Sequence, residues 1–259
     1  MNFKEIYEKG ISNARKQIIQ SSHFTTKPIM TTGILPPGST ICIQPAFDLN
    51  FEVDQKGMEK LIAMLEDKWN STSENERKNL LSILTNIYSI SDDYLGGLGI
   101  PSKRKNAYFH KKDGCLSLSE IESKNIGLCA ERSVIGHQLL SILQQANIIN
   151  YESYLINSHL TIDGKKETTI EPHSFIILKH KHDSSKQFIF DIENPIYYKI
   201  SDNDTPVPGV ALYPITEEEY ESFKVGKSIS PHSIFEQFGM SIVGDQRLYG
   251  DEKIIQFVD

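Results

Sequence analysis

One segment of the chain is apolar on more sides than a surface helix allows. Between Leu128 and about Ala146, apolar residues recur at helical spacing and cover more than one narrow stripe. They are Val134, Ile135, Leu139, Leu140, Ile142 and Leu143. This pattern predicts a central helix that is buried on most of its surface. A chain of 259 residues is long enough to surround such a helix with a core.

The segments that precede the central helix are mainly helical in pattern. We expect helices at residues 3–20, 54–68 and 73–90, and one short strand at residues 40–44. Ser73 and Glu76 resemble a capping box at the start of the third of these helices. Residues 91–127 are rich in turn-forming residues, and we expect them to form a loop.

The segments that follow the central helix alternate as strands do. Strands are expected at about residues 151–160, 168–180 and 186–192, with a polar turn between the last two. The fold class is therefore α+β: a central helix packed on an antiparallel sheet, with extra N-terminal helices. Residues 1–90 form a mainly helical part and residues 91–259 an α+β core, and we expect the two to form one compact unit.

Composition excludes several classes of function. The net charge of −7 argues against binding to nucleic acid or to an anionic membrane surface. No apolar run reaches the roughly 18–20 residues that span a bilayer. The N-terminus lacks a charged segment followed by an apolar one, so we expect a cytoplasmic protein, with a secreted effector without a signal as the alternative.

The three cysteines, Cys42, Cys115 and Cys129, are too few for a disulfide scaffold, and no pair has metal-ligand spacing. We expect no metal and no cofactor. Cys129 differs from the other two because it follows Gly127 at the start of the central helix. The N-terminal end of a helix stabilises a thiolate and offers free N–H groups to an oxyanion. This position predicts a nucleophile, since the thiolate is the form of cysteine that attacks.

A histidine and an aspartate follow on the two strands of a predicted hairpin. Asp191 lies within the apolar run 188–192, where an unpaired carboxylate would be costly to bury, so it needs a partner. If His173 and Asp191 lie opposite each other, the turn is centred on residue 182, where the sequence is polar. A slip of one residue would move Asp191 to the other face. Asn194 is a nearby substitute for the aspartate.

The order of these motifs resembles the transglutaminase-like superfamily, which shares the papain-like layout. The resemblance covers about residues 90–200 and rests on Gly127-Leu128-Cys129, on Pro172-His173-Ser174-Phe175 and on Phe190-Asp191 followed by Asn194-Pro195. It implies acyl transfer on a protein or peptide amide through a thioester. Cys129 would be the nucleophile, His173 the general base and acid, and Asp191 the residue that orients the histidine. An upstream side chain often completes the oxyanion hole in this superfamily, and Tyr94 is our candidate.

Two related layouts fit less well. Arylamine acetyltransferases share the arrangement, but their Arg-Gly-Gly approach to the cysteine is absent from this chain. The segment Cys129-Ala130-Glu131-Arg132 also resembles the signature of small cytidine deaminases, in which the cysteine binds zinc. Those enzymes need a Pro-Cys-x-x-Cys motif downstream, and this chain has no cysteine after Cys129. Glu131 and Arg132 are then interpreted as residues of the first helical turn.

Two alternatives to an enzyme remain open from the sequence. The first is a protein-binding module on the same fold that has lost catalysis. The second is a helical adaptor that uses the basic loop 103–112, which holds the cluster Lys103-Arg104-Lys105, as its contact surface. The glycine-rich stretch 94–99 lacks the order of residues that a phosphate-binding loop requires, so nucleotide binding is not expected there.

Overall fold

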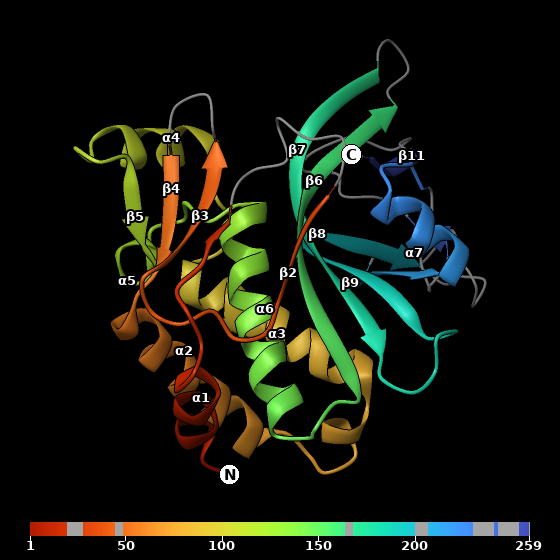
Figure 1. The fold of residues 1–259 in the computed structure, drawn as a ribbon, viewed down its shortest axis with the longest axis horizontal. Helices are drawn as coiled ribbons and strands as arrows, with labels where there is room; N and C mark the ends of the chain where they lie inside the picture. The colour runs from red at the N-terminus through yellow and green to blue at the C-terminus, as the bar shows by residue number, and fades with distance from the viewer. Residues whose placement is uncertain are drawn as a thin grey trace.

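Helix α6 (Cys129–Gln145) runs through the middle of the molecule (Figure 1). The computed structural model describes residues 1–19, 28–44, 49–163, 168–199, 207–229, 241–242 and 254–258. A large sheet contacts α6 on one side, and helices α1 (Phe3–Ile11), α2 (Gln55–Ser71) and α3 (Leu80–Leu95) contact it on the other. From Ala130 to Leu143 every residue of α6 is buried, as the apolar pattern predicts. The fold class is α+β.

The large sheet has seven strands, and all its neighbouring strands are antiparallel. Its main path runs β10-β8-β7-β6-β11, while β2 pairs with β6 and β9 pairs with β8. The strands are β2 (Ile29–Thr32), β6 (Tyr151–Asp163), β7 (Thr168–His180), β8 (Gln187–Lys199), β9 (Val207–Ile215), β10 (Ser241–Ile242) and β11 (Ile254–Val258). The prediction of a helix packed on an antiparallel sheet is thus confirmed.

A close approach between α6 and the sheet depends on Gly136. A Cβ at this position would lie 2.8 Å from the Cδ1 of Ile192 and 2.9 Å from that of Ile176, so a side chain would push the helix away. The opposite face of the sheet packs against α7 (Glu217–Lys224) through a second apolar cluster that includes Phe175 and Phe223. The sheet is therefore covered on both faces, and α6 is held tightly on one of them.

A smaller sheet in the N-terminal half was largely missed by the sequence patterns. It has four strands in the order β1-β3-β4-β5, namely β1 (Ile18–Ile19), β3 (Ser39–Gln44), β4 (Leu49–Val53) and β5 (Cys115–Ser117). Only β3 was expected. The helix predicted at 3–20 ends at Ile11 because Ile18 and Ile19 pair in parallel with Thr40 and Ile41. Their apolar spacing suits a helix, but the tertiary partner decides in favour of a strand.

The segment predicted to be a loop, residues 91–127, contains two helices. They are α4 (Pro101–Phe109), with a proline in its first turn, and the short α5 (Leu118–Ile121). The Ser73–Glu76 capping interaction is present, with reciprocal hydrogen bonds, but it caps the short 3-10 helix η3 (Glu76–Lys78). Helix α3 is capped instead by Asn79. Within the described residues no helix is long and apolar enough to cross a bilayer.

His137 on α6 makes the stability of the fold depend on pH. It is fully buried, and its Nε2 lies 2.9 Å from the Gly33 carbonyl while its Nδ1 lies 2.8 Å from the Ser153 hydroxyl. A carbonyl only accepts, so Nε2 carries the hydrogen and Nδ1 accepts from Ser153. Burial lowers the pKa of His137 from 6.5 to about 4. The neutral ring is therefore part of the folded state.

We expect the free energy of unfolding to fall as the pH drops from about 6.5 to about 4, because the unfolded chain then binds a proton that the folded His137 rejects. The contribution of this one residue is about 3 kcal/mol. Denaturant unfolding across this pH range, compared with His137→Gln, measures it, since glutamine keeps a donor and an acceptor but does not titrate. An unchanged pH slope in the variant would show that other groups cause the dependence.

Candidate active site

Cys129 is the first residue of α6, as predicted. The preceding Leu128 N–H donates to Oε2 of Glu131, at 3.1 Å. Within the described part of the chain no acceptor is recorded for the N–H groups of Cys129 and Ala130. One turn further along, the Ser133 hydroxyl donates to the carbonyl of Ser174 on β7, at 2.8 Å. The helix that carries the cysteine is therefore anchored to the strand that carries the histidine.

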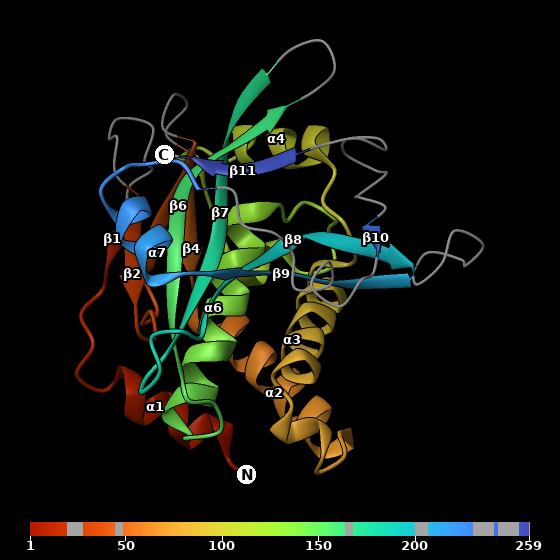
Figure 2. The same ribbon diagram turned by 90° about the vertical axis from the view of Figure 1, so that its right-hand side faces the viewer.

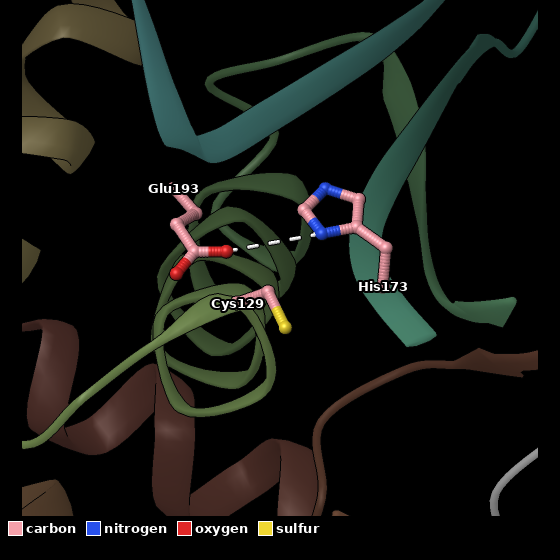
Figure 3. A group of neighbouring side chains, drawn as sticks. All are labelled: Cys129, His173 and Glu193. Atoms are coloured by element: carbon pink, nitrogen blue, oxygen red, sulfur yellow. Dashed lines mark ion pairs between the residues drawn. The ribbon is translucent and has the colours of Figure 1, made fainter. Parts of the chain in front are cut away.

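His173 and Asp191 are paired as predicted. Nε2 of His173 lies 2.8 Å from Oδ2 of Asp191, and both side chains are buried. Because a carboxylate accepts, Nε2–H is the donor. Oδ1 of Asp191 accepts the N–H of Glu193, at 3.1 Å, so both carboxylate oxygens are used. The other ring nitrogen, Nδ1, faces Glu193 and Cys129 (Figure 3).

The three predicted residues therefore come together. Sγ of Cys129 and a ring nitrogen of His173 lie within 4.8 Å of each other, and each group shifts the pKa of the other. Sγ of Cys129, a ring nitrogen of His173 and a carboxylate oxygen of Glu193 all lie within 4.8 Å of one another. A thiol, an imidazole and a carboxylate are thus adjacent in the order that thiol catalysis requires.

Glu193 belongs to the site and was missed by the sequence reasoning. Its Oε2 lies 3.8 Å from Nδ1 of His173, and its side chain is 14 % exposed. A signal was present in the sequence: Asp191 and Glu193 are two residues apart on one strand, so alternation places them on the same face. Glu193 was not predicted because it lies just outside the apolar run that ends at Ile192.

The register of the hairpin differs from the predicted one. If His173 lay opposite Asp191, Ile176 would lie opposite Phe188, whereas the structure pairs Ile176 with Phe190. The turn is thus centred on residue 183, and the shift of two residues preserves the faces of both strands. His173 and Asp191 therefore meet diagonally rather than across a ladder rung.

Strands β7 and β8 diverge at the site. The Ile176–Phe190 pair is the last in their ladder, while β7 remains paired with β6 as far as Thr168. Beyond this point β8 runs with β9, and their pairing is irregular between Asp191 and Ile196. Figure 2 shows β8 turning away from β7 near the upper end of α6. This divergence lets side chains from both strands reach the N-terminal end of the helix.

The electrostatics of the site differ from the simple expectation of a lowered thiol pKa. Burial raises the pKa of Cys129, and the Glu193 charge raises it further, whereas His173 and Arg104 lower it. Burial also raises the pKa of Glu193. Burial alone would lower the pKa of His173, but the charge and hydrogen bond of Asp191 raise it well above its ordinary value. Both shifts favour the protonated forms of the two groups, the thiol and the imidazolium.

A buried polar network supports the start of α6. Glu131 is fully buried, and its Oε1 accepts from Nε of Arg104 and from the Tyr108 hydroxyl, both at 2.8 Å. Arg104 and Tyr108 lie on α4, the helix that replaces the predicted loop. Of the basic cluster, Lys103 and Lys105 are exposed, but Arg104 is turned inward with a side chain only 16 % exposed. This segment is a structural support for Cys129, and only two of its three cations face solvent.

The glycine-rich stretch has a structural role at the same place. A Cβ at Gly99 would overlap the carbonyl oxygen of Gly127, so the two backbones touch. Gly97 has a positive φ of 96°, and its carbonyl accepts from Nη2 of the fully buried Arg132, at 2.6 Å. The same nitrogen lies 2.9 Å from Oδ1 of Asp92. These contacts fix the loop that leads into Cys129.

Two further candidates have different outcomes. Tyr94 is buried at the end of α3, and its hydroxyl donates to the Leu118 carbonyl at 3.0 Å. Its single hydrogen is committed there, so the assignment of Tyr94 to the oxyanion hole is not supported. The backbone of Asn194 belongs to β8, but its side chain lies outside the described part of the chain.

Comparisons with protein-family models, with curated proteins and with solved structures found no match for this chain. The functional argument therefore rests on the arrangement of side chains. A thiol at a helix N-terminus, an imidazole near it and a carboxylate behind the imidazole can together perform nucleophilic catalysis. The Cys129–His173–Glu193 group can also offer three metal ligands.

Proposed function

We propose that this chain is a cysteine-dependent enzyme that transfers the acyl group of an amide, with the layout of the transglutaminase-like superfamily. The observation that carries the proposal is the position of the His173 ring: its Nε2 lies 2.8 Å from Oδ2 of Asp191, and a ring nitrogen lies within 4.8 Å of Sγ of Cys129. The α+β fold, with a central helix that begins at the cysteine and packs on an antiparallel sheet, is compatible with that layout.

The chemical steps follow from this geometry. The step starts from the form in which the His173 ring has released its Nδ1 proton to solvent. Nδ1 then takes the thiol proton, and Sγ of Cys129 attacks the carbonyl carbon, so that the carbonyl electron pair moves to oxygen. The N–H groups of Cys129 and Ala130, at the positive end of α6, would stabilise that oxyanion. When the tetrahedral intermediate collapses, His173 returns the proton to the leaving amine and a thioester remains. Water or a second amine then releases the acyl group.

Asp191 has a positioning role in this scheme. Its hydrogen bond to Nε2 selects the tautomer in which Nδ1 faces the thiol, and its charge stabilises the imidazolium that forms. The N–H of Glu193 and the ring of His173 hold both of its oxygens, which prevents rotation. The raised pKa of the thiol means that the reactive form appears as the pH rises.

A non-catalytic protein-binding module is the second candidate, and one observation favours it. Burial raises the pKa of Cys129, which lowers its thiolate fraction at neutral pH. In a module of this kind the Cys–His–Asp group would be a buried polar cluster that stabilises the junction of α6 and the sheet. The two candidates differ in whether Cys129 accepts an acyl group.

Acylation by p-nitrophenyl acetate tests the proposal without knowledge of the substrate. We expect a burst of about one nitrophenolate per chain, and an acetyl group on Cys129 in peptides from an acid-quenched sample. Cys129→Ser and His173→Gln should abolish the burst, while Cys115→Ser should leave it unchanged. A primary amine that shortens the lifetime of the acyl-enzyme would identify an amine acceptor. Acetylation confined to Cys42 and Cys115 would reject the enzyme and favour the binding module.

A further inference from the structure

Three different ligand types converge at the end of α6. Sγ of Cys129, a ring nitrogen of His173 and a carboxylate oxygen of Glu193 lie within 4.8 Å of one another, and the His173–Glu193 separation is already 3.8 Å. Figure 3 shows the three side chains as neighbours that come from one helix and two strands. Ligands of a tetrahedral zinc ion lie roughly 3.5 Å apart, since the bonds are about 2.0–2.3 Å long. Small side-chain rotations bridge the difference.

The histidine is already arranged as a metal ligand. A zinc-binding histidine usually donates its second ring N–H to a carboxylate, which fixes the ring and increases its basicity. Here Nε2 donates to Asp191 at 2.8 Å, and Nδ1 faces Cys129 and Glu193. The same bond that orients a catalytic base therefore also orients a metal ligand.

The site also holds two carboxylates, Asp191 and Glu193, beside one imidazole. Arg104 is paired with Glu131 at 2.8 Å, and Arg132 with Asp92 at 2.9 Å. Oε2 of Glu193 forms an ion pair with Nδ1 of His173 at 3.8 Å, which is longer than a hydrogen bond, and the Glu193 side chain is only 14 % exposed. A mostly buried carboxylate at this distance from its partner can also act as a ligand to a metal ion.

We propose that Cys129, His173 and Glu193 bind a zinc ion, with Asp191 behind the histidine and one coordination position open. Binding displaces the thiol proton and the Nδ1 proton to solvent, so that thiolate, neutral imidazole and carboxylate hold the ion. Affinity therefore increases with pH. Three protein ligands of the types Cys, His and Glu are chemically suitable for zinc and leave room for a water molecule.

This site differs from the one that the Cys129-Ala130-Glu131-Arg132 segment resembles. Glu131 is not free to act beside the metal, because Arg104, Tyr108 and the Leu128 N–H occupy its oxygens. In the proposed site, His173 on β7 and Glu193 on β8 take the place of the two downstream cysteines that the deaminase zinc site requires. Zinc on Sγ blocks nucleophilic attack, so the metal-bound form is a reversible resting state of the thiol.

Zinc and cobalt titrations of the full chain, stripped with a chelator, test the proposal. We expect one Zn²⁺ per chain, and with Co²⁺ a thiolate-to-metal charge-transfer band together with the strong visible bands of four-coordinate cobalt. Cys129→Ser should remove the charge-transfer band. Glu193→Gln should weaken binding at least about tenfold, and Asp191→Asn should weaken it about 10- to 100-fold while the band is retained. Zn²⁺ should also protect Cys129 from iodoacetamide until a chelator is added.

Matched variants separate this site from other metal binding. Cys115→Ser and the double variant His180→Gln/His182→Gln remove a thiol and a histidine pair elsewhere, and both should bind zinc like the wild type. Binding that survives Cys129→Ser and Glu193→Gln but is lost in the His180/His182 variant would overturn the proposal, as would no binding at all. The acylation assay on chelated protein is independent: a normal burst without zinc binding rejects the metal site alone.

Discussion

Replacement of His173 by glutamine is expected to slow the alkylation of Cys129 by iodoacetamide about 10- to 100-fold near pH 8. The imidazolium is the charge that opposes the effects of burial and Glu193 on the thiol, and an opposite charge at this range is worth about 1–3 pKa units. Without the imidazolium, the thiolate fraction of Cys129 falls tenfold for each unit by which the thiol pKa rises. Mass spectrometry of the three cysteine peptides measures each rate in the same sample.

Glu193→Gln is expected to have the opposite effect on the rate of Cys129 alkylation. The Glu193 charge raises the pKa of Cys129, so its removal should move the pH profile of alkylation to lower pH and increase the rate near neutrality. His180→Gln, on the same strand as His173 but at its other end, is the matched control and should not alter the rate. Cys115, whose pKa burial raises to about 11, is the internal reference. Equal rates in wild type and His173→Gln would mean that the thiol and the ring are not coupled.

Glu131→Ala is expected to destabilise the protein by about 3–5 kcal/mol, because it breaks a buried ion pair from one side. Arg104, the Tyr108 hydroxyl and the Leu128 N–H would each lose their acceptor. The exposed pair of Glu74 and Lys78 is the matched control, and Glu74→Ala should cost less than about 1 kcal/mol. Denaturant unfolding of both variants gives the comparison.

A double variant keeps this prediction testable if Glu131→Ala does not fold. Glu131→Leu combined with Arg104→Met removes both charges and should recover a large part of the loss, since apolar replacements of a buried ion pair are often tolerated. If the double variant is as unstable as the single one, the ion pair is not the cause. Because the network holds the first turn of α6, partial destabilisation should also slow acylation of Cys129.

Patterns of nearby residues determined several features of the site correctly. The buried helix with Cys129 at its start follows from apolar spacing and Gly127, and the hairpin follows from two alternating runs around a polar turn. Asp191 within an apolar run indicated a buried partner, and that partner is His173. These features could be predicted because the spacing and polarity of residues close together in the sequence indicate them.

Other features depended on contacts between distant segments. The sequence places Arg104 in a basic cluster that is typical of a solvated surface. In the structure its side chain turns inward, because it pairs with Glu131, 27 positions away. Tyr94 was placed in the site by its position in the sequence, but its hydroxyl had a nearer acceptor at Leu118. Ile18 and Ile19 fit a helical pattern, yet they form a strand because they pair with the strand at residues 39–44. In each case a tertiary partner outweighed the local preference.

The sequence by itself determined which residue types form the candidate site and on which kinds of element they lie. Only the tertiary structure decided how they meet, through the two-residue shift of the hairpin, the divergence of β7 from β8 and the arrival of Glu193 beside the thiol. The physical reason is that alternation specifies the face of a strand but not its register. A shift of two residues keeps every side chain on its face, and here it brings Glu193 beside the histidine in addition to Asp191.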